Sequence, residues 1–478
     1  MPVYLDHAAT TPMLPGARAA YVDALGVVGN PSSIHSQGQQ AKRMLEESRE
    51  VVAASVGAEP IEVIFTSGGT ESINLGVKGL YWARQSPARP VVLVPGGEHH
   101  ATVDAVEWLV RHEGAEVVWL PVDALGRLHP AVLEAALERH GASVALVSVL
   151  WANNEVGTIQ DVRALVATAS RFGVPVHVDA VAAYGYLPLE FDAVGAAAMS
   201  ISAHKIGGPV GIGALVLSRR SSVEPLIHGG NQQRVRSGTQ DVAGAVAFAA
   251  AAAEVVREFG AGGGAGSAGV GAAGAGRGGA GSAGASGAVG WAAGAGGGGA
   301  GAASGAGTAG AVGGAAGAGG GVGWAAGAGG GAAAGSAGAG GESFVGGLAA
   351  LRDRLIEGVR EAVPEAVLRG DPEASGRLPG NAHFTFPGCE GDSLLFLLDL
   401  AGFSVSTGSA CQAGVPEISH VLTAMGVSDD EARGALRFTL GHGTTPAEVD
   451  ALVAALPAAY AAARKAGFST REVTPAAR

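Results

Sequence analysis

The chain has 478 residues, a formal net charge of −12 and two cysteines, Cys389 and Cys411. The acidic balance argues against a general nucleic-acid-binding surface, and the hydropathy pattern predicts neither a signal peptide nor a membrane span of about 20 bulky apolar residues. Because two cysteines without a CxxC spacing make neither a disulfide framework nor a good metal site, we expect free thiols, no bound metal and a cytoplasmic location.

Strands and helices alternate through the first half of the chain. An amphipathic helix is predicted at 42–57, and the alternation follows from residue 60 to residue 250. The segments that carry the predicted strands are 62–80, 89–109, 143–160, 174–185 and 196–219. This order predicts an α/β fold with a mainly parallel sheet covered by helices, whose ligands bind at the carboxyl ends of the strands.

Residues 260–341 consist almost entirely of glycine and alanine, and the string VGWAAGAGGG occurs twice, from Val289 and from Val322. Such a stretch has few side chains to bury and cannot offset the entropy cost of ordering, so we expect a flexible insertion. The ends of this insertion should lie close together, because it separates two consecutive helical segments.

A smaller α+β unit is predicted after the insertion. It contains a helix at 348–363, strands at 381–388, 403–411 and 434–441, and a final helix that begins at Pro446, with Thr445 as its N-cap. The chain is thus divided into 1–259, 260–341 and 342–478.

Lys205 is one of four lysines in a chain with 26 arginines. A lysine can lose its proton when it is desolvated and can form a Schiff base, which an arginine cannot do. Ser202 and His204 precede it in SAHK, and these neighbours suit a phosphorylated aldehyde cofactor. The alternative at this stage is a solvated surface lysine.

Three further features point to the same chemistry. The turn TSGGTES at 66–72, which contains Thr70, lies between a strand and a helix and can hold an anion at the helix N-terminus. Asp179 ends a strand and can pair with a protonated pyridine nitrogen. Cys411 lies among Ser, Gly and Ala residues, which favours an accessible nucleophile over a structural cysteine.

Together these stretches resemble the cysteine desulfurases of the class V aminotransferase family, pyridoxal phosphate enzymes that take sulfur from L-cysteine. The matching strings are YLDHAATTP, NPSSIHSQG, FTSGGTESINLGVKG, GGEHHATV, NNEVGTIQ, HVDAV, SAHKIGGPVGIGAL, RSGTQDVAGAVAFA, STGSACQAGVPE and LRFTLGHGTT. The resemblance implies the aspartate aminotransferase-like fold, with a seven-stranded, mainly parallel sheet in the large domain and a smaller α+β C-terminal domain.

By position, the resemblance implies that Lys205 binds the cofactor covalently and later moves the α-proton of the substrate. His99 would stack on the pyridine ring and relay protons, and Asp179 would pair with the ring nitrogen. The implied phosphate ligands are Gly69, Thr70, Ser202, His204 and, from the second subunit of a homodimer, Thr239.

The resemblance also implies which residues bind the substrate and take its sulfur. Asn154 matches the asparagine near the ring hydroxyl and the substrate carboxylate, which Arg437 would bind with its bidentate fork. Cys411 matches the nucleophile that takes the sulfur as a persulfide and passes it to an acceptor protein, such as an iron–sulfur scaffold or a tRNA-thiolating enzyme.

Three positions depart from the family pattern. Ala182 stands where glutamine is usual, Gln233 where glutamate is frequent, and His442 where arginine is common. The first removes a donor to the ring hydroxyl of the cofactor. Selenocysteine lyases, cysteine-sulfinate desulfinases and aminotransferases share the scaffold, and a cofactor-free sulfur-carrier adaptor is the alternative from another class. Cys411 favours sulfur transfer.

Overall fold

The computed structural model describes residues 2–230, 232–259, 343–408 and 418–471, with side chains up to 465. The Gly/Ala-rich insertion 260–341 and Cys411 lie outside the described residues. The described residues on the two sides of the insertion belong to one compact unit.

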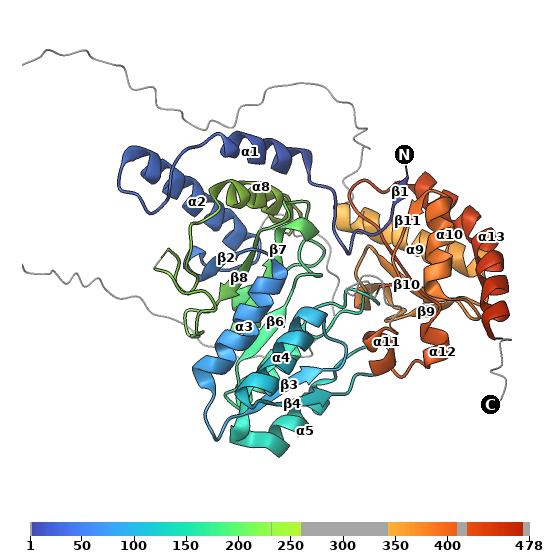
Figure 1. Ribbon diagram of the computed structural model, residues 1–478, viewed down its shortest axis with the longest axis horizontal. Coiled ribbons are helices and arrows are strands. Elements are labelled where there is room, and N and C mark those ends of the chain that lie inside the picture. Colours follow the sequence, from blue (N-terminus) through green and yellow to red (C-terminus); the bar gives the residue numbers. More distant parts are fainter. Residues whose placement is uncertain (1, 231, 260–342, 409–417, 472–478) are drawn as a thin grey trace, which may run out of the picture. The chain divides into compact units, whose positions relative to one another are not determined.

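A seven-stranded sheet with the order β2-β8-β7-β6-β5-β3-β4 forms the centre of the first part of the chain (Figure 1). Its strands are β2 (Val63–Thr66), β3 (Val91–Pro95), β4 (Glu116–Leu120), β5 (Val144–Leu150), β6 (Val176–Asp179), β7 (Ala198–Ser202) and β8 (Gly213–Leu217). β8 is antiparallel to both of its neighbours, and the other pairs are parallel. The mainly parallel seven-stranded sheet is therefore confirmed.

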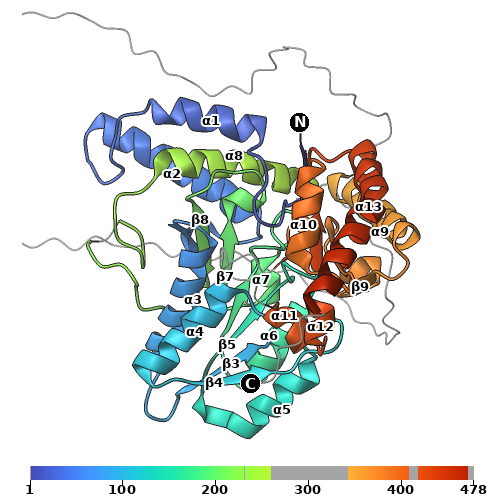
Figure 2. The same ribbon diagram turned by 45° about the vertical axis from the view of Figure 1, so that its right-hand side comes forward.

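Helices cover both faces of this sheet. The helices of this region are α1 (Pro15–Leu25), α2 (Ser36–Ala54), α3 (Gly69–Arg84), α4 (His100–Glu113), α5 (Pro130–His140), α6 (Val162–Arg171), α7 (Phe191–Val194) and α8 (Val242–Phe259). One apolar core contains side chains of α3 and α4, and another contains side chains of α2, α5, α6 and α8. The alanine-rich α8 packs against α1 and α2, because its small side chains allow a close approach (Figure 2).

The C-terminal part contains the antiparallel sheet β12-β10-β9. Its elements are α9 (Phe344–Ala362), β9 (Val367–Arg369), β10 (Asn381–Thr385), α10 (Gly391–Leu400), β11 (Phe403–Ser404), α11 (His420–Ala424), α12 (Asp429–Ala432), β12 (Ala435–Thr439) and α13 (Pro446–Arg471). Side chains of α9, α10 and α13 share an apolar core with β10 and β12. The N-terminal strand β1 (Val3–Tyr4) pairs in parallel with β11, so the first residues of the chain join this C-terminal part.

Two boundaries differ from the sequence-based expectation. The helix predicted at 42–57 begins earlier, at Ser36, because the His35 imidazole Nδ1 accepts a hydrogen bond from the Gly38 amide and caps it. The strand expected at 403–411 has only two residues in β11, since beyond them the chain makes an isolated bridge, Ser406 to Arg437.

Hydrogen bonds join the two helices that flank the insertion, α8 and α9. The Glu258 carboxylate, near the end of α8, accepts hydrogen bonds from the Phe344 and Val345 amides at 3.3 and 3.1 Å. These amides belong to the first turn of α9 and have no acceptor within the helix. The last turn of α8 and the first turn of α9 therefore lie together, as the sequence predicts. None of the helices in the described ranges is long and apolar enough to cross a membrane.

Candidate active site

An open pocket of about 330 Å³ lies at the carboxyl ends of β5, β6 and β7. Eight of the predicted site residues line it, and they are Gly69, Thr70, His99, Asn154, Asp179, His204, Lys205 and Arg437. Parallel strands bring their carboxyl ends to one edge of a sheet, which explains why residues so far apart in the chain converge here.

The turn between β2 and α3 forms one end of the pocket. Gly68 has φ +147°, a conformation open to glycine, and it precedes the first turn of α3 without a side chain to cap it. A Cβ atom on Gly69 would lie 2.9 Å from Val181, so only glycine fits there without a shift. The Ser202 hydroxyl, buried beneath this turn, has no hydrogen-bond partner among the described residues.

Asp179 is buried at the end of β6, and its Oδ1 accepts a hydrogen bond from the Val181 amide at 3.0 Å. Burial raises the pKa of its carboxyl to about 6, although the amide and Lys205 both favour the carboxylate. A cationic ring nitrogen opposite this group would stabilise its charged form, as the predicted role requires.

The two histidines at the pocket are neutral at pH 7. His99 caps α4, with its Nδ1 accepting from the Ala101 amide at 3.0 Å, so the ring carries its proton at Nε2. Burial, followed by the charge of Lys205, lowers the pKa of His99 to about 4. The pKa of His204 also falls to about 4 for the same two reasons, and its Nδ1 lies 3.2 Å from the Thr10 hydroxyl.

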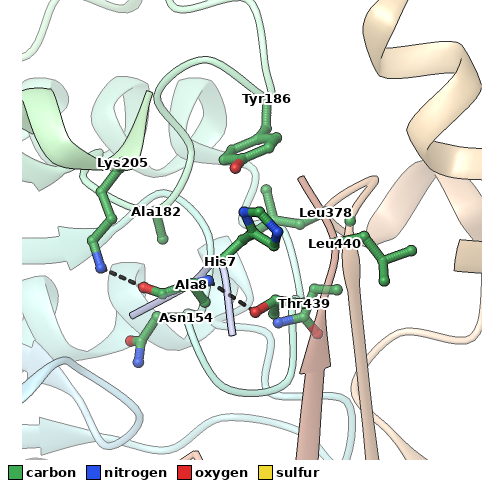
Figure 3. Close-up of a pocket in the computed structure, with 11 residues that line it drawn as sticks. His7, Ala8, Asn154, Ala182, Tyr186, Lys205, Leu378, Thr439 and Leu440 are labelled. Atoms are coloured by element: carbon green, nitrogen blue, oxygen red, sulfur yellow. Dashed lines mark hydrogen bonds between the residues drawn. The ribbon is translucent and has the colours of Figure 1, made fainter. Parts of the chain in front are cut away.

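Lys205 follows β7 in a single 3₁₀ turn and reaches toward the N-terminal segment (Figure 3). Its Nζ donates to the Ala8 carbonyl and, at 3.0 Å, to the Ala9 carbonyl. The Ala8 amide in turn donates to the Thr439 hydroxyl of β12 at 2.8 Å. The solvated surface lysine is thus ruled out, because Lys205 lines the pocket and is held by backbone carbonyls.

Arg437, on β12, also lines the pocket. Its Nη2 donates to Asp6 Oδ1 at 2.7 Å and its Nη1 to the Asn154 carbonyl at 2.9 Å. The residue is 4% exposed. Asp6, Ala8 and Ala9 belong to the string YLDHAATTP, which the sequence comparison matched without assigning a role to any of them.

The three other predicted residues are Ser202, which lies beneath the Gly69 turn, Thr239 and Cys411. Thr239 is exposed and does not line the pocket, and Cys411 lies outside the described residues. Gly408, three residues before Cys411, does line the pocket. The segment of Thr239 is joined to the Gly69 turn by Arg236, whose Nε contacts Glu71 Oε1 at 2.9 Å.

The three departures from the family pattern have different structural settings. The Gln233 amide accepts from the Phe65 N–H and donates to the Phe65 carbonyl, both at 2.9 Å, and a glutamate could not make the second bond. His442 stacks on Phe344 with ring centroids 3.7 Å apart. Ala182 lines a cavity beside Lys205, where a glutamine would project (Figure 3).

Comparisons with known proteins agree with this geometry. The family model described as aminotransferase class-V matches residues 3–262. The chain is 44% identical over 469 residues to an IscS-like cysteine desulfurase of Mycobacterium tuberculosis, with 98% of each chain covered. The chain belongs to the cysteine desulfurases of the class-V aminotransferase family.

Other relatives agree with this assignment. The cysteine desulfurase IscS of Dictyoglomus turgidum is 33% identical, with 94% of this chain and 92% of that protein covered. A solved NifS-like protein superposes with a TM-score of 0.71 at 27% identity, over 96% of this chain and 99% of the other. The aspartate aminotransferase-like fold expected from the sequence is therefore confirmed.

Cysteine desulfurases depend on pyridoxal phosphate, and the residues present fit this group. Ser202 offers a buried hydroxyl that has no hydrogen-bond partner in the described part of the chain, beside the N-terminus of α3, where no side chain caps the helix. This setting suits a phosphate. Asp179 offers a buried carboxyl, and Lys205 offers an amine in the same pocket. Only position 182 lacks the polar side chain that is usual in the family.

Proposed function

We propose that this desulfurase removes the sulfur of L-cysteine as a persulfide on Cys411 and releases L-alanine. The observation that carries the proposal is that Lys205, His99, Asp179 and Arg437 line one pocket. A nucleophilic amine, a neutral imidazole, a buried carboxyl and a carboxylate-binding guanidinium are the groups that this reaction needs.

Pyridoxal phosphate would be held by the Gly69–Thr70 turn, Ser202 and His204 at its phosphate, and by Asp179 at its ring nitrogen. When bound, it supplies an electron sink for the electron pair left at the substrate α-carbon. The buried setting of Asp179 supports this role, because a carboxylate in a low-dielectric site pairs strongly with a nearby cation.

Lys205 and His99 handle the protons in this proposal. Lys205 takes the α-proton of the substrate once its amine is neutral, and the nearby carbonyls of Ala8 and Ala9 orient that amine. His99 holds a proton at Nε2 while its Nδ1 is occupied by the Ala101 amide, so it can exchange a proton with the substrate thiol through one nitrogen only.

Arg437 and Asn154 bind the substrate carboxylate. Both line the pocket, and the Asn154 carbonyl fixes the guanidinium of Arg437. A planar guanidinium presents several N–H donors, so hydrogen bonds to the protein leave others for a ligand.

Cys411 acts as the nucleophile in its thiolate form. Its sulfur attacks the substrate sulfur, so an S–S bond forms while the Cβ–S bond of the substrate breaks. The electron pair of the broken bond remains on the substrate carbon, which takes up a proton and leaves as part of alanine. The persulfide then transfers its outer sulfur to an acceptor protein of an iron–sulfur or tRNA-thiolation route, in the reducing cytoplasm.

The proposed assembly is a homodimer in which Thr239 binds the phosphate in the other subunit. Thr239 is exposed in this chain, and large apolar side chains are exposed at Val28 (83%), Ile34 (94%) and Val210 (77%). Their exposure supports an interface that buries them, because the burial of large apolar side chains favours association.

The test is an assay of sulfide and alanine release from L-cysteine, with added cofactor and a thiol reductant. We expect equal amounts of both products from the wild type and loss of both in Cys411→Ala. Full activity of Cys411→Ala would instead indicate a lyase that acts without a protein thiol, such as one that acts on selenocysteine. Alanine formed without sulfide would contradict the proposal.

A further inference from the structure

Asp6 neutralises Arg437 within the protein. Arg437 Nη2 donates to Asp6 Oδ1 at 2.7 Å, with the two side chains 5% and 21% exposed. Nη1 of the same guanidinium donates to the Asn154 carbonyl at 2.9 Å. The arginine is therefore fixed by two acceptors, from two different segments of the chain, before any ligand arrives.

Backbone contacts hold Asp6 in place. It forms a β-bridge with Thr439, two residues beyond Arg437 on β12. The Asp6 carbonyl also accepts from the Tyr4 hydroxyl at 3.0 Å and from the Ala9 amide at 3.1 Å. These contacts fix the backbone of Asp6 beside β12, at a position from which its carboxylate reaches Arg437.

The same segment contacts Lys205. The carbonyls of Ala8 and Ala9 accept from Lys205 Nζ, and the Ala8 amide donates to the Thr439 hydroxyl (Figure 3). Residues 6–9 thus connect the arginine assigned to the substrate carboxylate with the lysine assigned to the α-proton.

We propose that Asp6 is a positioning residue that sets the strength of carboxylate binding in this pocket. Its hydrogen bond orients the guanidinium of Arg437, and its negative charge limits how tightly a second carboxylate binds there. Two carboxylates near one guanidinium repel each other, so the charge also favours release of the product alanine, which carries the same carboxylate as the substrate. This inference rests on the proposed function, in which Arg437 binds the substrate carboxylate.

Two substitutions separate the hydrogen bond from the charge. Asp6→Asn keeps an oxygen acceptor for Arg437 but removes the charge, whereas Asp6→Ala removes both. The probe is 3-mercaptopropionate, which has the thiol and carboxylate of the substrate but no amine to react with the cofactor. We measure its dissociation constant by calorimetric titration of the holoenzyme.

The expected dissociation constants move in opposite directions. Asp6→Asn binds the probe about fivefold more tightly, because the repulsion is gone. Asp6→Ala binds it about tenfold more weakly, because Arg437 loses a charge-assisted hydrogen bond that orients it. The KM for L-cysteine follows the same order, with kcat changed by about twofold or less. The KM for cysteamine, which lacks the carboxylate, stays unchanged in both variants.

Controls separate this role from a structural one. Asp123→Asn removes an equal charge from an aspartate whose side chain is 29% exposed beside His129, and it should leave the dissociation constant unchanged. Thermal unfolding of each variant verifies that it is folded. A shift of the two Asp6 variants in the same direction, or an equal shift with cysteamine, would overturn the inference.

Arg437→Gln distinguishes this inference from the proposed function. Unchanged probe binding in Arg437→Gln would overturn both, since the carboxylate would then bind elsewhere. Loss of probe binding in Arg437→Gln, with no sulfide release by the wild type, would refute only the proposed reaction.

Discussion

The side of the pocket toward the central sheet and the side toward the N-terminal segment are built by different means. On the sheet side, Asp179 ends β6, Lys205 follows β7 by three residues, and Gly69 follows β2 by three residues. On the other side, Arg437 contacts Asn154, 283 residues away, and Asp6, 431 residues away. The first side follows from local strand-and-turn patterns, whereas the second depends on long-range packing. The sheet side should therefore control the chemical step, and the other side should control substrate binding.

The largest effect is expected on the sheet side, at Lys205. Lys205→Ala removes the amine that moves the α-proton, and we expect sulfide release to fall by about 1000-fold or more. Lys205→Arg is the matched control, because it keeps the positive charge but offers no neutral amine. Recovery of activity in Lys205→Arg would mean that charge alone is required, and the assigned role would be wrong.

The next largest effect is expected at Arg437, on the side of the pocket that binds the substrate. Arg437→Lys keeps a charge but loses the planar fork, so the KM for L-cysteine should rise about 10-fold or more while kcat changes less. Steady-state kinetics with L-cysteine and with cysteamine measure the change, and only L-cysteine should be affected. A fall in kcat alone would contradict the division between a chemical side and a binding side.

The raised pKa of Asp179 predicts how the stability of the protein depends on pH. Its pKa in the folded protein, about 6, lies above the value of 3.8 for an unperturbed aspartate, so the folded state binds the additional proton between about pH 4 and pH 6. Stability is therefore lost as pH rises through this window. In the cofactor-free protein, Asp179→Asn should match the wild type below pH 4 and exceed its free energy of unfolding by about 3 kcal/mol above pH 6.

Urea unfolding at pH 4 and pH 7 measures this difference. Cofactor binding should reverse the order at pH 7, because it would give the Asp179 carboxylate a cationic partner that an asparagine cannot match. An equal difference between the two proteins at both pH values would show that the carboxyl of Asp179 is not perturbed.

The smallest effect is expected at the junction of α8 and α9, which is also held by a long-range contact. Glu258→Ala removes the acceptor for the Phe344 and Val345 amides and should lower the free energy of unfolding by about 1 kcal/mol. Glu258→Gln keeps an acceptor oxygen and should lose less. Chemical denaturation measures both, and activity should be unchanged, because Glu258 does not line the pocket with His99 and Arg437.

Much of the fold could be predicted because its signals are local. β5 has seven buried residues, six of them apolar, and the polar residues Asn153, Asn154 and Glu155 follow shortly after it. This pattern indicates a central parallel strand that ends at a binding edge. The start of α2 could not be placed, since His35 is not a residue that commonly caps helices. β11 was predicted too long, because its partner is the distant strand β1 and pairs with only two of its residues.

The candidate site likewise contains residues that the sequence predicted and residues that it did not. Eight predicted residues line the pocket, and Ser202 lies beneath it with a hydroxyl that finds no partner within the described ranges. The role of Asp6 was missed because no local pattern indicates that its carboxylate meets Arg437, 431 residues away. The carbonyls of Ala8 and Ala9 were missed because a role for a backbone carbonyl leaves no signature in a side chain. The matched string YLDHAATTP was the only available signal for them. The roles of Thr239 and Cys411 remain predictions.

The family, the succession of strands and helices and the residues at the strand ends could all be inferred from the sequence, because short-range periodicity and motif order encode them. The pairing of Asp6 with Arg437, the neutral state of His99 and the raised pKa of Asp179 became known from the three-dimensional structure. Desolvation and ion pairing depend on what surrounds a side chain in space. These surroundings come from segments separated by up to 431 residues, whose approach no local pattern records.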